Sequence, residues 1–274
     1  MMDALKYYLR ENVLIRTLYL PFKRAKLKVE LRRYQRSKWH ERIRKYHNIH
    51  NGETCFIVGN GPSLTVDDLD GIKQYPTFAS NGIFNVLEQT EWKPTYYISV
   101  DPQYVDSHKK EIISLEGPIK YITCRVDFPE SNDTERIFEY NKFKINKWND
   151  QSAFINEDVS TFFSIGYTVT FTAIQMAIYM GFKTIVLLGV DFSYPVMKDK
   201  NGKVVLNDNI RRVHFYNDSQ KEARYNIFNY EGALNAYKAA ELYATKNGIN
   251  ILNATRGGNL EVFERVRLEN YFSI

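Results

Sequence analysis

The sequence predicts an α/β protein with a Rossmann-like, doubly wound and mostly parallel sheet, a lid segment and a basic helical N-terminal arm. From residue 53 onward, short β-rich runs alternate with helical ones. Several of these runs are apolar throughout, as strands buried on both faces are. Helical segments between strands imply parallel pairing through right-handed crossovers. The 274 residues, 44% of them apolar, suffice for one such domain with an appendage.

The strands and helices of this domain can be placed in order. The expected strands cover residues 54–58, 77–80, 95–100, 119–123, 184–188 and 249–252. Two long helices are expected over residues 168–180 and 232–247, because a glycine follows each of them. The segment 193–230 is expected to be irregular, since it is rich in Asn, Asp, Lys and Tyr. A stretch of this length inside a compact domain is typical of a lid or a binding loop.

Basic charge is concentrated at the N-terminus. Residues 1–50 contain 14 Lys and Arg against 4 Asp and Glu, a net charge of +10, whereas the remaining 224 residues contain 23 and 28, a net charge of −5. Apolar residues recur there at helical spacing, and Pro21 is expected to separate two helices. We therefore expect a basic amphipathic helical arm over residues 1–50 and the Rossmann-like domain over residues 51–274. The arm either packs on the domain or on a second copy, as in a homo-oligomer, or binds an anionic membrane surface. Nucleic acid is not expected, because no recognition motif accompanies the charge.

Several other classes of protein are disfavoured. Cys55 and Cys124 are too few for a disulfide framework or a four-cysteine zinc site, which favours a reducing, cytoplasmic location. No apolar run approaches the roughly 20 residues of a bilayer span, so membrane contact would be peripheral, at the inner face. A P-loop and a GxSxG elbow are absent from the sequence, which disfavours P-loop kinases and ordinary α/β-hydrolases. No DxD pair follows a strand, and no metal is expected.

The first strand runs into the sequence CFIVGNGPSL, residues 55–64. In a doubly wound sheet, ligands bind beyond the carboxyl ends of the strands. The glycines would let the backbone approach a ligand, and the helix start that follows would offer free N–H groups to a phosphate. A plain strand-to-helix turn is the alternative. The residues at this predicted crevice are Gly59, Asn60, Gly61, Pro62 and Ser63.

Polar residues also follow three other expected strands. Asn81 follows the second strand, Asp101 the third, and Gly189 with Asp191 the fifth. Each alone is most often a turn former or a helix cap. Together they predict one ligand crevice, because parallel strands bring their carboxyl ends side by side. Thr168, at the start of the first long helix, is either an N-cap or a further ligand contact.

The expected lid contains a titratable side chain among cations. His214 lies near Arg211, Arg212 and Tyr216. This combination suits a site where an anionic leaving group departs and a hydroxyl is deprotonated. A histidine on an ordinary surface loop is the alternative.

Five sequence motifs carry a family resemblance: FIVGNGPSL, SNGIF, TAIQMAIYMGFKTIVLLGVDFSY, HFY and NATRGGNLEVFERVRLE. They resemble the motility-associated-factor glycosyltransferase domain, also described as the MptE-like domain, and the central part is similar to bacterial sialyltransferases. The resemblance covers about residues 53–270. It implies a Rossmann-like fold and the transfer of a nonulosonic acid from a CMP-activated donor to a glycan or lipid-linked acceptor, with inversion and without metal.

The resemblance also implies roles for individual residues. Asn60 and Ser63, with the glycines, would contact the CMP part, and Asn81 would contact the donor. Thr168 aligns with a threonine of the sialyltransferases, and Asp101 matches the motility-associated pattern. His214 would take the proton of the acceptor hydroxyl, while the phosphate would leave beside Arg211, Arg212, Tyr194 or Tyr216.

Two other functions remain open on the sequence. Archaeal MptE-like relatives transfer diphosphate from ATP to a hydroxymethyl pterin, a reaction for which Asp101, Asp191 and Asp218 could hold magnesium. The second open function is that of a nucleotide-binding module without catalysis.

Overall fold

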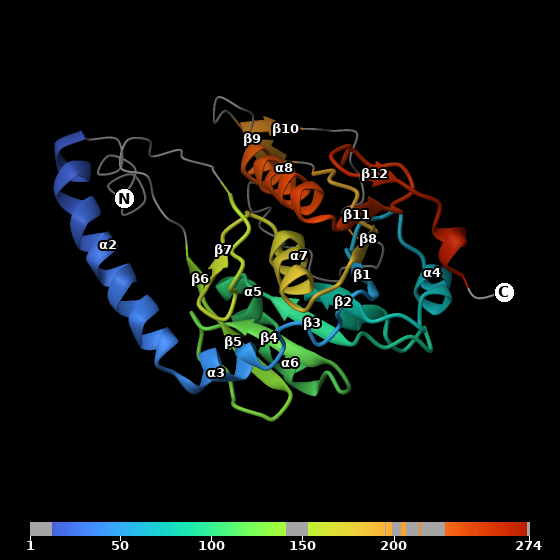
Figure 1. The fold of residues 1–274 in the computed structure, drawn as a ribbon, viewed down its shortest axis with the longest axis horizontal. Coiled ribbons are helices and arrows are strands. Elements are labelled where there is room, and N and C mark those ends of the chain that lie inside the picture. The colour runs from blue at the N-terminus through green and yellow to red at the C-terminus, as the bar shows by residue number, and fades with distance from the viewer. Residues whose placement is uncertain are drawn as a thin grey trace.

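The computed structural model describes residues 13–140, 153–194, 196–198, 204–206, 214 and 228–272 (Figure 1). Its centre is an eight-stranded sheet in the order β12-β11-β8-β1-β2-β3-β4-β5, in which every pair of neighbours is parallel. The doubly wound α/β fold predicted from the sequence is therefore confirmed. The strands are β1 (Thr54–Val58), β2 (Thr77–Ser80), β3 (Tyr96–Ser99), β4 (Ile119–Thr123), β5 (Thr134–Ile137), β8 (Thr184–Leu188), β11 (Asn250–Asn253) and β12 (Glu264–Arg265).

The chain enters the sheet in its middle. From β1 it proceeds through β2, β3 and β4 to β5 at one edge, and then returns to β8 on the other side of β1. Strands β1 and β8 pair over their whole length, from Thr54 opposite Thr184 to Val58 opposite Leu188. The direction of the strand order thus reverses between β1 and β8, which is where open α/β sheets bind their ligands.

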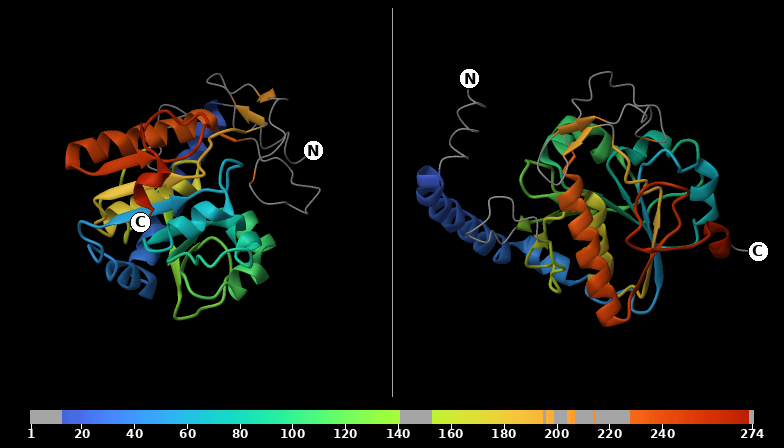
Figure 2. Two further views of the ribbon diagram at one scale, coloured as in Figure 1. Left: turned by 90° about the vertical axis from the view of Figure 1, so that its right-hand side faces the viewer. Right: turned by 90° about the horizontal axis from the view of Figure 1, so that it is seen from above.

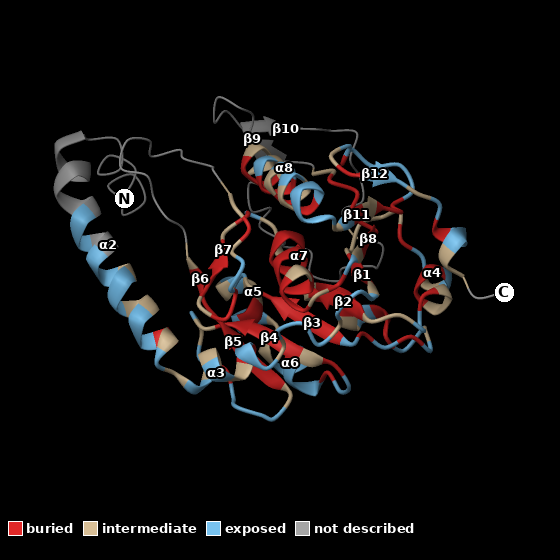
Figure 3. Ribbon diagram, in the orientation of Figure 1, coloured by how far each residue is buried: buried red, intermediate tan, exposed pale blue. Residues whose placement is uncertain are grey.

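Alternating side chains of the strands build two separate cores. In β1, Cys55 and Ile57 face one core, whereas Phe56 and Val58 face the other. The first core is covered by α3 (Lys38–Arg44), α7 (Val169–Tyr179) and α8 (Tyr230–Asn247). The second is covered by α4 (Val66–Gly71), η1 (Asn81–Val86), α5 (Pro102–Ser107), α6 (Lys109–Ser114) and η2 (Leu268–Tyr271). Both faces of the sheet are therefore buried, as Figure 3 shows, and this explains the apolar strands.

The two long helices form close to where the sequence predicts them. Thr168 is the N-cap of α7, and Gly248, with a φ of +61°, ends α8 in the left-handed region. Helix α7 is buried around most of its circumference, with Phe171, Ile174 and Met176 fully enclosed. It holds a fixed position between the sheet and α8 (Figure 3).

The N-terminal segment differs from the prediction at Pro21. Helix α2 (Val13–Gln35) runs through this proline without ending, so the expected break is wrong. A proline deprives a helix of one backbone donor. Because Pro21 is exposed, water can hydrogen-bond the carbonyl that loses its partner.

The second half of α2 contacts the domain, although the helix lies at one end of the molecule (Figure 2). Leu31 packs in a small apolar cluster with Tyr34, whose hydroxyl donates to the Arg136 carbonyl at 2.9 Å. Ile43 of α3 is fully buried in the first core. None of the helices within the described ranges is long and apolar enough to span a bilayer.

The segment expected to be irregular contains regular structure. Strands β9 (Val196–Lys198) and β10 (Val204–Leu206) pair antiparallel, which corrects that expectation. The dipeptide Asn201-Gly202 between them is a strong hairpin signal that the polar composition of the segment conceals. A further two-stranded parallel pair, β6 (Glu139–Tyr140) with β7 (Phe163–Ser164), lies beyond β5 in the sequence.

Candidate active site

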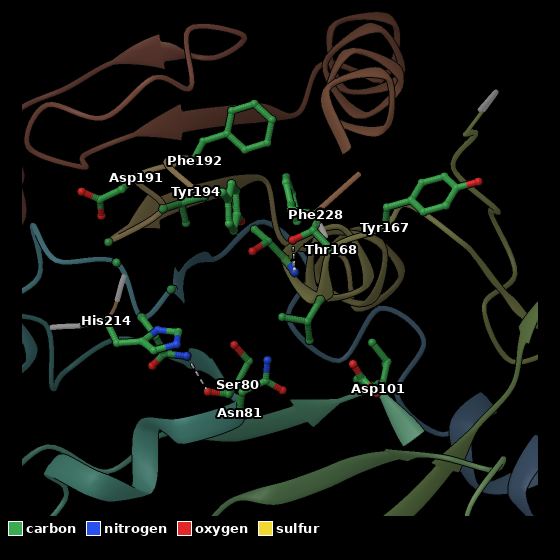
Figure 4. A pocket seen from close by; sticks show the side chains of 18 of the residues that line it. Ser80, Asn81, Asp101, Tyr167, Thr168, Asp191, Phe192, Tyr194, His214 and Phe228 are labelled. Carbon is green, nitrogen blue, oxygen red and sulfur yellow. Dashed lines mark hydrogen bonds between the residues drawn. The ribbon is translucent and has the colours of Figure 1, made fainter. Parts of the chain in front are cut away.

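A cavity of about 600 Å³ lies at the carboxyl ends of β1, β2, β3 and β8, facing the start of α7 (Figure 4). The four corners predicted to converge do converge there. The predicted site residues that line the cavity are Gly59, Asn60, Gly61, Asn81, Asp101, Thr168, Gly189, Asp191, Tyr194 and His214. The sequence thus locates the crevice, while the role of each residue in it stays a prediction.

Other predicted site residues do not line the cavity or cannot be placed. Pro62 and Ser63 follow the lining residues of the first strand end, and the Ser63 hydroxyl donates to Asp191 Oδ2 at 2.7 Å. Ser63 therefore positions a carboxylate that does face the cavity. Arg211, Arg212 and Tyr216 lie outside the described residues.

The glycines after β1 line the cavity and are also required by the neighbouring strand end. A Cβ atom on Gly59 would lie 2.3 Å from the Gly189 carbonyl oxygen, and one on Gly61 would lie 1.8 Å from Asp191 Oδ2. Their N–H groups donate to the Leu188 and Gly189 carbonyls at 2.8 and 2.9 Å. The two glycines thus join β1 to β8 at the point where the strand order reverses.

The helix after this turn offers fewer free N–H groups than the sequence suggests, because two of those at its start are already bonded. Thr65 accepts a hydrogen bond from the Asp68 N–H, and the Asp68 carboxylate accepts one from the Thr65 N–H. This reciprocal capping box satisfies donors at the start of α4. Asp67 and Asp68 also place negative charge in the first turn, which disfavours an anion there.

Asn60 joins two strand ends, and one acceptor atom of its side chain has no partner in the described ranges. Its Nδ2 donates to the Ser80 carbonyl at 2.9 Å, whereas its Oδ1 is buried and has no hydrogen-bond partner among the residues of the described ranges. A buried acceptor without a partner costs about 1 to 3 kcal/mol. A ligand that donates an N–H or O–H to Asn60 Oδ1 would remove this cost.

Backbone strain is concentrated around the cavity. Asn81, Tyr167 and Phe192 all line it and have φ angles of 47°, 60° and 53°. Non-glycine residues in the left-handed region are uncommon, and they tend to cluster at functional sites. Asn81 is held in place from β3, because its carbonyl accepts from the Tyr97 hydroxyl and its Oδ1 from the Ser99 hydroxyl, both at 3.1 Å.

Asp101 and Thr168 both act as helix caps at the edge of the cavity. Asp101 Oδ1 accepts from the N–H groups of Gln103 and Tyr104 at 2.8 and 3.3 Å, and so begins α5. The Thr168 hydroxyl accepts from the Thr170 N–H at 3.4 Å and begins α7. The capping alternative is correct for both, and both still line the cavity (Figure 4).

Burial alters the titration of two lining groups that the sequence singles out. Burial raises the pKa of Asp191, an effect that the hydrogen bond from Ser63 opposes. Burial also raises the pKa of the Tyr194 hydroxyl, and the ring of Tyr194 stacks on Phe228 with 3.5 Å between ring centroids. Tyr194 is therefore a neutral hydrogen-bond donor at physiological pH.

Glu139 is a titratable lining residue that the sequence reasoning missed. Its side chain is buried, at 8% exposure, on β6. Burial raises its pKa to about 7; the nearby Asp101 carboxylate adds to this rise, and Arg125 opposes it. An acidic residue next to a tyrosine in a polar stretch carries no sequence signal for such a position.

The charged groups of the described lining are mostly acidic. Asp101, Glu139 and Asp191 are the carboxyl groups, His214 is the one titratable base in the described lining, and no Lys or Arg side chain appears in this part of it. Across the described ranges, no group of three or more His, Cys, Asp and Glu residues is arranged to hold a metal ion.

Three solved structures are similar to the chain. A solved structure of the MAf glycosyltransferase from Magnetospirillum magneticum AMB-1 is 15% identical, covering 85% of this chain and 38% of that chain, with a TM-score of 0.46. The sialyltransferase CstII from Campylobacter jejuni, solved with cytidine-5'-monophosphate, is 15% identical over 81% of this chain and 88% of that chain, with a TM-score of 0.44. The monofunctional α-2,3-sialyltransferase Cst-I from the same organism is 20% identical over 81% and 80% of the two chains, with a TM-score of 0.40.

The sequence comparisons give a family. No curated protein matches the chain. The family model described as 6-hydroxymethylpterin diphosphokinase MptE-like matches residues 30–196, which is more than half of the sequence. The chain belongs to this MptE-like family.

Proposed function

We propose that the chain is a glycosyltransferase that moves a nonulosonic acid from a CMP-activated donor to a hydroxyl of a surface glycan or glycolipid, with inversion and without metal. The observation that carries the proposal is the cavity where the strand order reverses, whose described lining offers main-chain groups, amides and hydroxyls besides its carboxyl groups. Such a site suits a nucleotide that is bound by hydrogen bonds.

The cytidine part of the donor is proposed to lie beside the ends of β1 and β2. Asn60 Oδ1 is the buried acceptor without a partner in the described structure, and the amino group of cytosine or a ribose hydroxyl can donate to it. Asn81 and His214 line the same cavity (Figure 4). Because Asn60 Oδ1 is costly to leave unpaired, a ligand that donates a hydrogen bond to it is favoured over one that does not.

The phosphate of the donor is proposed to lie at the start of α7. This buried helix directs the positive end of its dipole into the cavity, where Thr168 and Thr170 are lining residues. The neutral Tyr194 hydroxyl can donate to the departing phosphate. Arg211, Arg212 and Tyr216, which lie outside the described residues, are proposed to complete the charge neutralisation.

Thermal unfolding in the presence of nucleotides tests the ligand class. We expect CMP to raise the melting temperature equally with and without magnesium, more than CDP, UDP, GDP or ATP does. At a hundred times its Kd, a ligand adds about 2.7 kcal/mol, which is roughly 5 to 10 °C for a domain of this size. Asn60→Ala is expected to reduce the CMP effect, whereas Asn247→Ala, an exposed substitution on α8, is expected to leave it unchanged. Absence of any effect of CMP on the wild type would contradict the proposal.

A diphosphokinase acting on a hydroxymethyl pterin is the second candidate. The description of the family model favours it, and so does the position of Asp101 and Asp191 on the same cavity, where carboxylates can hold magnesium. Asp218, the third carboxylate considered for this role, lies outside the described residues. Stabilisation by ATP that requires magnesium would favour this candidate. Stabilisation by CMP with no turnover of a CMP-sugar would favour a non-catalytic nucleotide-binding module.

Contact of α2 with an anionic membrane is proposed as well. Phe22 and Val29 are 76% and 48% exposed, and Lys28 and Arg32 are exposed on the same helix. We expect the protein to sediment with phosphatidylglycerol vesicles at low salt, and the double variant Lys28→Glu, Arg32→Glu to sediment less. The matched variant Lys238→Glu, Lys246→Glu on α8 is expected to behave as the wild type. Equal loss of sedimentation in both variants would contradict a specific contact through α2, because net charge alone would then explain the binding.

A further inference from the structure

Strand β6 separates two cavities, and its side chains alternate between them. Phe138 and Tyr140 belong to the apolar cluster around Tyr34, which faces α2. Glu139, between them, points the other way and lines the first cavity. The alternation along residues 138–140 thus places the Glu139 carboxyl group at the first cavity.

The Glu139 carboxyl group has no hydrogen-bond partner within the described parts of the chain. Only its backbone carbonyl is engaged, by Arg125 Nη2 at 3.0 Å. The charged and titratable groups that act on the side chain are Asp101, Arg125 and Cys124. The Glu139 residue is nine-tenths buried and lines the cavity, so a ligand in the cavity can supply the donor that its carboxyl group lacks.

The second cavity, of about 710 Å³, lies on the α2 side of β6. Ile165 lines both cavities, and Arg125, which holds the Glu139 carbonyl, lines the second. Aromatic faces with cationic and hydroxyl groups around them suit an amphipathic ligand such as a glycan. These groups include Arg33, Tyr34, Ser37 and Trp39.

The two titratable groups suited to proton transfer lie at different ends of the first cavity. Figure 4 shows His214 and Asp191 on one side of the cavity and Asp101 on the opposite side. Glu139 pairs with Phe163 of β7, and Tyr167, which soon follows β7, lies on the Asp101 side of the cavity in Figure 4. Glu139 therefore belongs to the Asp101 end, in agreement with the effect of the Asp101 charge on its pKa. The first cavity thus has a nucleotide end with His214 and an opposite end, next to the second cavity, with Asp101 and Glu139.

We propose that Glu139 is the catalytic residue that accepts the proton of the acceptor hydroxyl. This rests on the proposed glycosyl transfer. The acceptor oxygen forms a bond to the anomeric carbon of the donor, and the bond from that carbon to the phosphate oxygen breaks. The phosphate oxygen keeps the electron pair, and the hydroxyl proton moves to the Glu139 carboxylate. Glu139 thus takes the role that the sequence predicts for His214, which lies at the nucleotide end.

Release of CMP from CMP-N-acetylneuraminic acid, with water as the acceptor, tests the assignment. We expect Glu139→Gln to lower this rate about 100-fold at pH 8, since a general base contributes on the order of 10² or more. The CMP-induced rise in melting temperature is expected to persist in this variant. Glu139→Asp is expected to keep part of the rate, and Glu88→Gln, an exposed control, to keep all of it.

The pH profile gives a readout that a structural role would not change. The wild-type rate is expected to rise through about pH 7 as Glu139 ionises. Asp101→Asn still caps α5 but removes a negative charge that raises the pKa of Glu139, so the rise is expected to move to lower pH. His214→Ala is expected to keep the rise. If CMP stabilises Glu139→Gln and this variant keeps both rate and profile, the inference is wrong while the proposed function stands. If CMP does not bind the wild type, both fail.

Discussion

Gly61→Ala is expected to destabilise the protein by about 3 kcal/mol, the upper part of the range for inserting an atom into a packed site. The new Cβ atom would lie 1.8 Å from Asp191 Oδ2 and 2.7 Å from the Gly189 carbonyl oxygen. Neither neighbour can move cheaply, because Asp191 accepts from Ser63 and Gly189 is backbone. Displacing Asp191 would also distort the cavity, so CMP is expected to lose its stabilising effect. Urea unfolding of the variant, with and without CMP, measures both consequences.

Gly257→Ala is the matched control for this substitution. A Cβ atom there would meet nothing within 4 Å, but its φ of +65° makes alanine unfavourable by roughly 1 to 2 kcal/mol. A cost at Gly61 no larger than the cost at Gly257 would show that the contact between β1 and β8 is looser than described. The close approach would then not be what requires glycine after β1.

Arg256→Ala is expected to cost about 2 to 4 kcal/mol. Its guanidinium forms two hydrogen bonds with the Asp68 carboxylate, from Nη1 to Oδ2 at 2.7 Å and from Nη2 to Oδ1 at 2.5 Å. The Asp68 side chain is only 3% exposed, so removing the arginine leaves a buried carboxylate without its cation. The estimate stays below the 3 to 5 kcal/mol of a fully buried pair, roughly, because the Arg256 side chain is 48% exposed. Chemical unfolding measures the loss.

An exposed ion pair provides the comparison. Lys73 and Glu91 lie 2.7 Å apart with side chains 55% and 81% exposed, and Lys73→Ala is expected to cost much less than Arg256→Ala, because exposed ion pairs contribute little to stability. The double variant Asp68→Asn, Arg256→Ala is expected to recover part of the stability that Arg256→Ala loses, because the buried charge is gone. Equal costs for Arg256→Ala and Lys73→Ala would mean that the α4 carboxylate is solvated.

The parallel sheet could be predicted because its signal is local. Each central strand, such as β1 or β8, is an apolar run short enough to be distinguished from a helix and is bounded by turn residues. Strands β5 and β12 were missed, since their sequences TERI and ER are polar and they pair only through the neighbours that tertiary structure supplies. The strand order, and with it the reversal between β1 and β8, depends on such long-range pairing.

The position of the cavity could be predicted from the sequence, whereas its individual contacts could not. Any parallel sheet gathers the carboxyl ends of its strands, so Asn60, Asn81 and Asp191 had to lie at one edge. What each atom does depends on partners distant in sequence: the contact of Gly61 with Asp191 spans 130 positions, and Glu139 enters the cavity through pairing with Phe163. The sequence also gives no indication of the left-handed backbone at Tyr167 and Phe192, because aromatic residues are not favoured in that region.

A crystal structure of the protein soaked with an inert CMP-sugar tests the central claim most directly. We expect the cytosine or ribose to donate a hydrogen bond to Asn60 Oδ1, the phosphate to lie at the start of α7, and the sugar to extend toward Glu139. A nucleotide bound elsewhere on the molecule, or a cavity that stays empty at saturating CMP-sugar, would contradict the account.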